Sequence, residues 1–127
     1  MSDYKAIVES YLLALDNSDL QGILALFEDD ATVISPFLGT LAPRIFFPKV
    51  IENSAATEIT VFDICVSARD KARAIGYFNY DWTLNDGTHV LFDCCDVFEF
   101  SGVQKINSMI IMYDTYPIRE LVGDKYT

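Results

Sequence analysis

One acidic residue lies on the apolar face of a segment that alternates like a β-strand. In "THVLFDCCDVFEF", residues 88–100, successive side chains would point to opposite faces. One face then carries Val90, Phe92, Cys94, Asp96, Phe98 and Phe100. A carboxylate among apolar groups is costly when ionised, so it either finds a partner or stays protonated with a raised pKa. We therefore expect Asp96 to point inward, whereas Asp93 lies on the opposite, mixed face.

A tyrosine poses a similar problem near the start of the chain. Tyr11 lies on the apolar stripe of a predicted helix, with Ile7 and Leu15 one turn away on either side. A buried phenol usually seeks a hydrogen-bond partner. A pocket between this helix and the strand could receive both Tyr11 and Asp96, so that two hydrogen-bond donors meet in apolar surroundings.

Both residues also have purely structural interpretations. Tyr11 could be a core aromatic whose hydroxyl bonds to the backbone, and Asp96 could be a structural carboxylate bonded to a neighbouring hydroxyl. We favour a ligand site, because both isolated polar groups lie on inward faces.

The other residue types form no pattern for a metal, a phosphate or a nucleophile. His89 is the single histidine, and there is no CxxC or HxxxH pair that could hold a metal. There is no glycine-rich phosphate loop and no G-x-S-x-G segment. Cys94 and Cys95 lack the basic neighbour that activates a thiol. We therefore expect no metal and no cofactor.

Composition indicates one acidic globular domain over residues 1–127. The chain is 51% hydrophobic, enough for a core, and its net charge of −10 disfavours nucleic acid and anionic membranes as partners. No apolar run approaches the ~20 residues of a membrane helix, and no signal peptide is visible. Three cysteines, an odd number, do not suggest a disulfide framework. We expect a cytoplasmic protein with reduced thiols.

The segments that must position these residues predict an α+β fold. Helical spacing predicts helices over residues 3–16 and 19–28, and a short strand follows over residues 31–35. "PRIFFPKVIENSA" predicts a third helix, which could start late or kink at Pro48 because proline lacks a backbone donor. From Thr57 onward, four β-branched and aromatic segments predict long strands joined by tight turns. We expect a curved antiparallel sheet with the helices covering one face.

The predicted strands also supply the walls of a ligand pocket. Their large inward-facing side chains are Phe78, Tyr80, Trp82, Phe92, Phe98, Met109 and Tyr113. The last strand, residues 106–113, is apolar on both faces. Such a strand is expected to be covered on one side by the core and on the other by a partner subunit, which predicts a homodimer.

The order of these segments resembles the nuclear transport factor 2-like superfamily, on its SnoaL-like and ketosteroid isomerase-like side. The resemblance covers roughly residues 4–119 and depends on "YLLALDNSDLQGILALFEDDATVISPF", "DVFEF" followed by "KINSM", and "YDTYPIRE". It implies a cystatin-like α+β fold, with helices closing a cone-shaped cavity. In ketosteroid isomerases a tyrosine and a protonated aspartic acid donate hydrogen bonds to a substrate oxyanion. By this resemblance, those roles fall on Tyr11 and Asp96.

The sequence departs from that family at the general base. The family's base is an aspartate between the "ATV" strand and the proline, and Ser35 occupies this position here. An unactivated serine hydroxyl does not accept a proton near neutral pH, so the usual isomerisation route lacks its base. The catalytic positions implied by the resemblance are therefore Tyr11, Asp96 and the substituted Ser35.

Two functions follow as expectations. The first is a pocket for a hydrophobic small molecule that bears a carbonyl or hydroxyl, in an isomerase-, cyclase- or dehydratase-like enzyme that uses another base. The alternative is a non-catalytic module for ligand binding, dimerisation or protein interaction.

Overall fold

The computed structural model describes residues 3–116 and 118–119 of the chain. The remainder of the expected 1–127 domain, residues 1–2, 117 and 120–127, lies outside the described part. The helices are α1 (Tyr4–Asp16), α2 (Leu20–Leu24) and α3 (Pro43–Glu52). The strands are β1 (Phe27–Ser35), β2 (Gly39–Leu41), β3 (Ser54–Val66), β4 (Arg73–Leu84), β5 (His89–Phe100) and β6 (Ile106–Tyr113).

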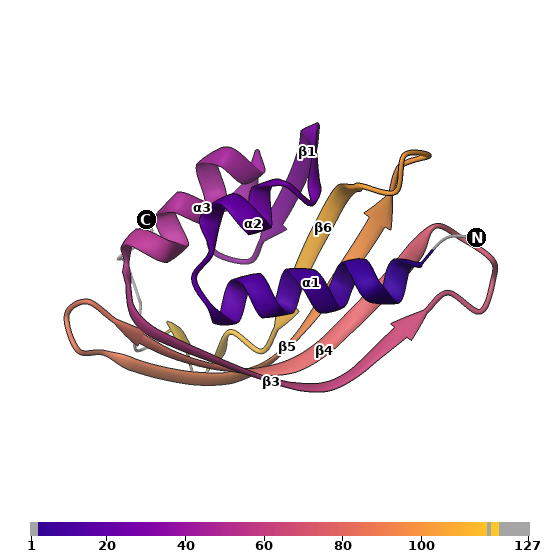
Figure 1. Cartoon of the computed structure of the whole chain (residues 1–127). Helices are drawn as coiled ribbons and strands as arrows, with labels where there is room; N and C mark the ends of the chain where they lie inside the picture. Colours follow the sequence, from indigo (N-terminus) through magenta and orange to yellow (C-terminus); the bar gives the residue numbers. More distant parts are fainter. Residues whose placement is uncertain (1–2, 117, 120–127) are drawn as a thin grey trace.

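The strands form one curved, six-stranded sheet, and α1, α2 and α3 lie together on its concave side (Figure 1). The strand order is β2-β1-β6-β5-β4-β3. The expected α+β class and the four long strands are confirmed. The sheet is mixed rather than wholly antiparallel, because β1 runs parallel to β6. This pairing joins distant segments, so the hairpin turns of the sequence do not reveal it.

Helix α1 packs closely against β3 and β4. Its first turn is capped by the Asp3 carboxylate, which accepts a hydrogen bond from the Ala6 amide at 3.1 Å. The helix approaches β4 at Gly76, where an added Cβ would lie 3.2 Å from Val8 Cγ1. A glycine at this strand position therefore sets how near α1 comes to the sheet.

The second helix is shorter than expected. Helix α2 ends at Leu24, whereas the sequence predicted a helix over residues 19–28. Strand β1 already begins at Phe27, four residues before the expected start. Phe27 pairs with Ile106, and the Ile106 amide donates to the Leu26 carbonyl at 2.9 Å. Pairing with a distant strand overrides the local helical spacing here.

The third helix is continuous across its internal proline. Helix α3 starts with Pro43 in its first turn, where the missing donor costs little, and it contains Pro48. Phe46 and Phe47, directly before Pro48, are buried. We infer that burial of these two rings offsets the backbone hydrogen bond that Pro48 cannot make.

The convex face of the sheet carries apolar side chains in register. One row crosses four strands through Ile34, Ile110, Val97 and Ile75. In the next row Met112, Cys95 and Tyr77 are paired in the same way, and Tyr77 and Met112 are 41% and 50% exposed. As expected, β6 has two apolar faces, since Met109 is wholly buried on the concave side. None of the described helices is long and apolar enough to span a membrane.

Candidate functional site

A cavity lies under the helices, between α1, α3 and the concave face of the sheet, and it is partly open to solvent. Its volume is about 80 Å³. Its lining is mostly aromatic and aliphatic, and its polar members include Tyr11, Ser35, Cys94 and Asp96. A few convergent polar groups in an apolar hollow are typical of small-molecule sites.

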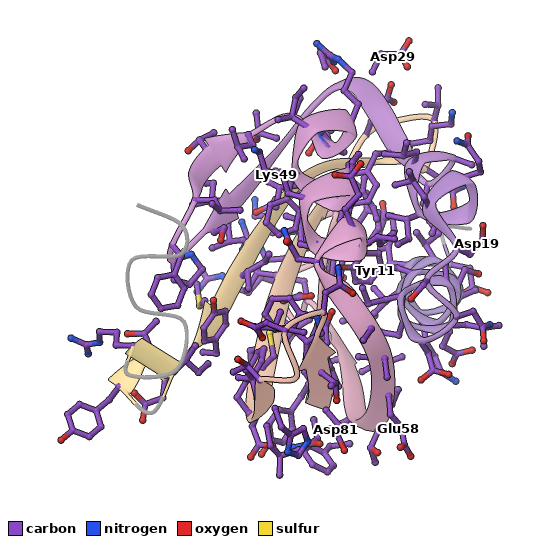
Figure 2. The ribbon with its side chains drawn as sticks, turned by 90° about the vertical axis from the view of Figure 1, so that its left-hand side faces the viewer. Tyr11, Asp19, Asp29, Lys49, Glu58 and Asp81 are labelled. Carbon is purple, nitrogen blue, oxygen red and sulfur yellow. The ribbon has the colours of Figure 1, made fainter. Side chains whose placement is uncertain are left out.

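Tyr11 enters the cavity from α1. Its ring packs edge-on against Phe27, Phe47 and Phe98, with ring centroids 5.2–6.2 Å apart. Within the described residues its hydroxyl makes no hydrogen bond to the protein. Burial, and secondarily the negative charge of Asp96, raises the pKa of Tyr11 well above its ordinary value. The phenol therefore stays protonated and can act as a donor. Figure 2 shows Tyr11 inside the molecule.

Asp96 enters the cavity from β5, on the apolar face that the alternation predicted. It is 2% exposed, and it pairs across the sheet with Gly76 on one side and Ile111 on the other. Burial raises the pKa of Asp96 to about 7, and the hydrogen bond from Cys94 opposes this shift. Near neutral pH the carboxyl group is therefore present both as a neutral acid and as a carboxylate.

Cys94 touches Asp96 directly. Its thiol Sγ lies 3.1 Å from Oδ1 of the carboxyl group and donates a hydrogen bond to it. Burial first, and then the charge of Asp96, raises the pKa of the Cys94 thiol far above its ordinary value. Cys94 is thus a protonated donor rather than a nucleophile, and it occupies one oxygen of Asp96.

Ser35, at the position of the family's base, also lines the cavity. The residue is 8% exposed, and its Oγ accepts a hydrogen bond from the Leu38 amide at 3.4 Å. No histidine, lysine or arginine side chain lines the described cavity wall beside Ser35. The structure therefore brings Tyr11, Asp96 and Ser35 to one cavity.

The predicted wall residues divide into two groups. Those that line the cavity are Phe78, Tyr80, Trp82, Phe92 and Tyr113. Phe98 and Met109 do not line it. Both are fully buried in the core, where they are paired neighbours on the adjacent strands β5 and β6. Phe98 packs on Tyr11 and Phe100, at centroid distances of 5.2 and 6.4 Å. Helix α1 covers this end of the sheet, which is why inward-facing side chains there become core.

Several wall residues were missing from the sequence-based set. Helix α3 contributes Phe46, Phe47 and Val50, and the β1–β2 turn contributes Phe37 and Leu38. Helix α1 adds Leu15, and β6 adds Ile111. The apolar face of the third helix was visible in the sequence, but nothing local indicates which element it faces.

Within the described residues, the histidine, the basic side chains and the acidic side chains other than Asp96 do not line this cavity. His89 Nε2 and Asp81 Oδ1 form an exposed pair at 2.5 Å. Asp19, Asp29, Glu58 and Asp81 all point away from the interior in Figure 2. The described residues hold no cluster of histidine, cysteine and acidic side chains that could bind a metal ion.

No protein-family model matches the sequence. Solved structures nevertheless share the fold over almost the whole chain. An NTF2-like protein of unknown function from Burkholderia pseudomallei K96243 is 21% identical with a TM-score of 0.79, over 97% of this chain and 99% of its own. An LEH-like epoxide hydrolase of M. tuberculosis is 20% identical with a TM-score of 0.74, over 94% of this chain and 89% of its own.

A third neighbour is a hypothetical protein of ketosteroid isomerase-like fold from Catenulispora acidiphila DSM 44928, in complex with trimethylamine. It is 15% identical with a TM-score of 0.76, and the match covers 92% of each chain. At these identities the likeness establishes the fold alone. The chain has the NTF2-like fold, as its segment order predicted.

Proposed function

Starting from an NTF2-like fold, we propose that the protein binds a small, mostly apolar molecule in the cavity beneath α1. The ligand's polar group lies at Tyr11 and Asp96. One observation carries this proposal: the two side chains come from α1 and β5 and line the same cavity, whose walls are otherwise largely apolar. Fold neighbours include an epoxide hydrolase and a protein in complex with trimethylamine, which supports a small-molecule role for the cavity.

A carbonyl or hydroxyl oxygen is the polar group that suits the neutral form of the site. When Asp96 is protonated it donates a hydrogen bond, and Tyr11 supplies a second donor from the opposite wall. The Cys94 thiol already occupies Asp96 Oδ1, which leaves the other carboxyl oxygen for the ligand. Two donors converging on one oxygen also suit a developing oxyanion.

The size of the cavity limits the ligand. A volume of about 80 Å³ is below the roughly 150 Å³ that holds a benzene molecule, and far below the roughly 300–1,000 Å³ of drug-sized pockets. A steroid or polyketide ring system does not fit within this volume. A ligand of about five non-hydrogen atoms does, and at roughly 1.5 kcal/mol per atom its Kd is no tighter than a few micromolar.

Binding is supported more directly than catalysis. Ser35 cannot replace an aspartate base, and the described wall of the cavity contains no histidine or lysine. With Asp96 in its neutral form, isomerase-, cyclase- or dehydratase-like chemistry would be confined to substrates acidic enough to lose a proton without that base. Tyr11 and Asp96 would then stabilise the oxyanion that forms.

NMR titration tests the binding proposal. We expect tert-butanol and cyclobutanone, each of five non-hydrogen atoms, to cause saturable shifts of the amides of Tyr11 and Asp96 at millimolar concentrations. Val50→Phe should remove these shifts by filling the cavity. Val103→Phe, in an exposed loop, is the matched control and should keep them. Shifts that rise linearly to about 200 mM in the natural protein, or that survive Val50→Phe, would contradict the proposal.

We also propose that the convex face of the sheet pairs two copies of the chain. The row of Ile34, Ile110, Val97 and Ile75, with Tyr77 beside it, forms an apolar band on a face that none of α1–α3 covers (Figure 1). A two-fold axis would place this band against the same band of the second copy. An uncharged band suits this arrangement, because no like charges then meet at the interface. We expect sedimentation analysis under reducing conditions to give twice the chain mass of 14.3 kDa. A monomer at 100 μM, a concentration of the order at which weak dimers form, would reject this pairing.

A further inference from the structure

Five aromatic rings in successive contact, together called the aromatic cage, line the cavity. Tyr80 stacks on Phe92 at a centroid distance of 5.2 Å, and Phe92 lies 4.7 Å from Tyr113. Trp82 packs on Tyr80 at 5.8 Å, and Phe37 on Tyr113 at 6.3 Å. All five rings line the cavity. The faces of such rings carry partial negative charge, which attracts a cation within about 6 Å of a ring centroid.

The described wall of the cavity contains one acidic side chain, Asp96, and no basic one. The titratable groups that line the cavity are Tyr11 from α1, Tyr80 from β4, Cys94 and Asp96 from β5, and Tyr113 from β6. Helix α3 and the β1–β2 turn add only uncharged side chains to the described wall. When Asp96 ionises, its charge has no positive partner there, and a buried carboxylate without one is unfavourable.

We propose that the cavity binds a small alkylammonium cation, with the aromatic cage around its alkyl groups and its charge beside Asp96. This inference rests on the proposed small-molecule site but reverses the state of Asp96, which here is the carboxylate rather than the neutral acid. The cation supplies the missing counter-charge, and the ring faces replace part of its hydration. The net charge of −10 favours the approach of a cation from solution.

The two ligand classes depend on pH in opposite directions. Since the pKa of Asp96 is about 7, the carboxylate dominates at pH 8.5 and the neutral acid at pH 5.5. A cation therefore binds more tightly as pH rises through 7. A neutral ligand that accepts a hydrogen bond from Asp96 binds more tightly as pH falls. Apparent affinity scales with the competent fraction, which predicts about 30-fold weaker cation binding at pH 5.5 than at pH 8.5.

Tetramethylammonium and tert-butanol make a matched pair of probes. They share size and shape, neither titrates in this pH range, and they differ in charge. Trp82 is the single tryptophan and lines the cavity, so its fluorescence reports on occupancy. In 0.15 M NaCl we expect tetramethylammonium to bind at least tenfold more tightly than tert-butanol at pH 8.5, with the preference lost at pH 5.5.

Variants identify the residues responsible. Asp96→Asn should abolish both the cation preference and its pH dependence, whereas Asp93→Asn, an exposed change on the same strand, should leave both intact. Phe92→Leu should weaken tetramethylammonium more than tert-butanol. Equal affinities for the two probes at pH 8.5, or a preference that survives Asp96→Asn, would overturn the inference. Should Asp96→Asn fail to fold, the pH comparison on the natural protein decides alone. If neither probe saturates, the small-molecule site itself is rejected.

Discussion

In the proposed site, the carboxyl group of Asp96 lowers stability when it is charged and serves as a hydrogen-bond donor when it is neutral. Its burial in an apolar wall disfavours the charged form, so the pKa of the carboxyl group rises from 3.8 to about 7. The same shift keeps a neutral donor available at pH values where an exposed aspartate would be fully ionised. Cys94 moderates the effect, because its thiol donates to the carboxyl group at 3.1 Å.

The raised pKa predicts a stability that falls as pH rises. In the folded state Asp96 binds its proton more tightly than in the unfolded state, so its contribution is fully present below about pH 3.8 and is lost as pH passes through 7. Between pH 5 and pH 8.5 we expect a loss on the order of 3 kcal/mol in the free energy of unfolding, measured by urea denaturation.

Variants separate this contribution from that of other titrating groups. Asp96→Asn keeps the size of the side chain and removes the charge, so it should lose much less stability over the same pH range. Asp93→Asn, whose side chain is exposed, should behave like the natural protein. Equal pH slopes for the natural protein and Asp96→Asn would show that this carboxyl group titrates normally.

At the scale of elements, the distance between α1 and the sheet determines whether a cavity remains beneath the helix. Helix α1 approaches β4 at Gly76, where Val8 and Leu12 occupy the space that a side chain would need. Farther along the helix, Tyr11 and Leu15 line the cavity. Helix α3 and the β1–β2 turn close the other side with Phe46, Phe47 and Phe37. The site therefore depends on packing between elements that are distant in the sequence.

Gly76→Ala tests this close approach. The new Cβ would lie 3.2 Å from Val8 Cγ1 and 3.5 Å from Leu12 Cδ1, so the helix or its side chains must shift. We expect a destabilisation of roughly 1–3 kcal/mol in urea unfolding. Adding Val8→Ala should recover part of the loss from overpacking, as a double-mutant cycle would measure.

Gly102→Ala provides the control for that experiment. An added Cβ at Gly102 meets no atom within 4 Å, so the change should stay within about 0.5 kcal/mol. If Gly76→Ala is equally harmless, the approach of α1 to β4 is less tight than the structure indicates.

At the scale of the whole molecule, the two faces of the sheet differ: the concave face is apolar, and the convex face carries an apolar band beside charged pairs such as Arg73–Glu99. The concave face builds the core and the cavity, and the convex face leaves Tyr77, Leu91 and Met112 at least 41% exposed. A chain of net charge −10 does not associate through general attraction. The proposed pairing through the convex face would therefore come from contact between apolar side chains.

A charge placed in the convex band should weaken the proposed pairing of two copies. Tyr77→Glu would put a carboxylate from each copy into the proposed interface, and we expect at least a tenfold weaker dimerisation constant by sedimentation equilibrium. Leu13→Glu, an exposed change on α1 at the opposite side of the sheet, should leave the constant unchanged. An unaffected dimer in Tyr77→Glu would place the interface elsewhere.

Local patterns in the sequence were enough for the fold class and for the two central polar residues. Strand alternation placed Asp96 on the inward face, and helical spacing placed Tyr11 on the buried stripe. Each of these periods depends on one helix or one strand alone, so it does not change with the packing of the rest of the chain. The segment order then indicated the NTF2-like arrangement.

Tertiary structure decided which inward-facing side chains surround empty space. Phe98 and Met109 became core and Phe46 became wall, because the path of α1 and α3 across the sheet determines what each strand residue meets. The parallel pairing of β1 with β6 and the cavity volume of about 80 Å³ likewise depend on distances between elements far apart in the chain. A sequence period fixes the direction in which a side chain points. A cavity, however, forms only where two packed surfaces leave space between them, and only the folded chain brings both surfaces together.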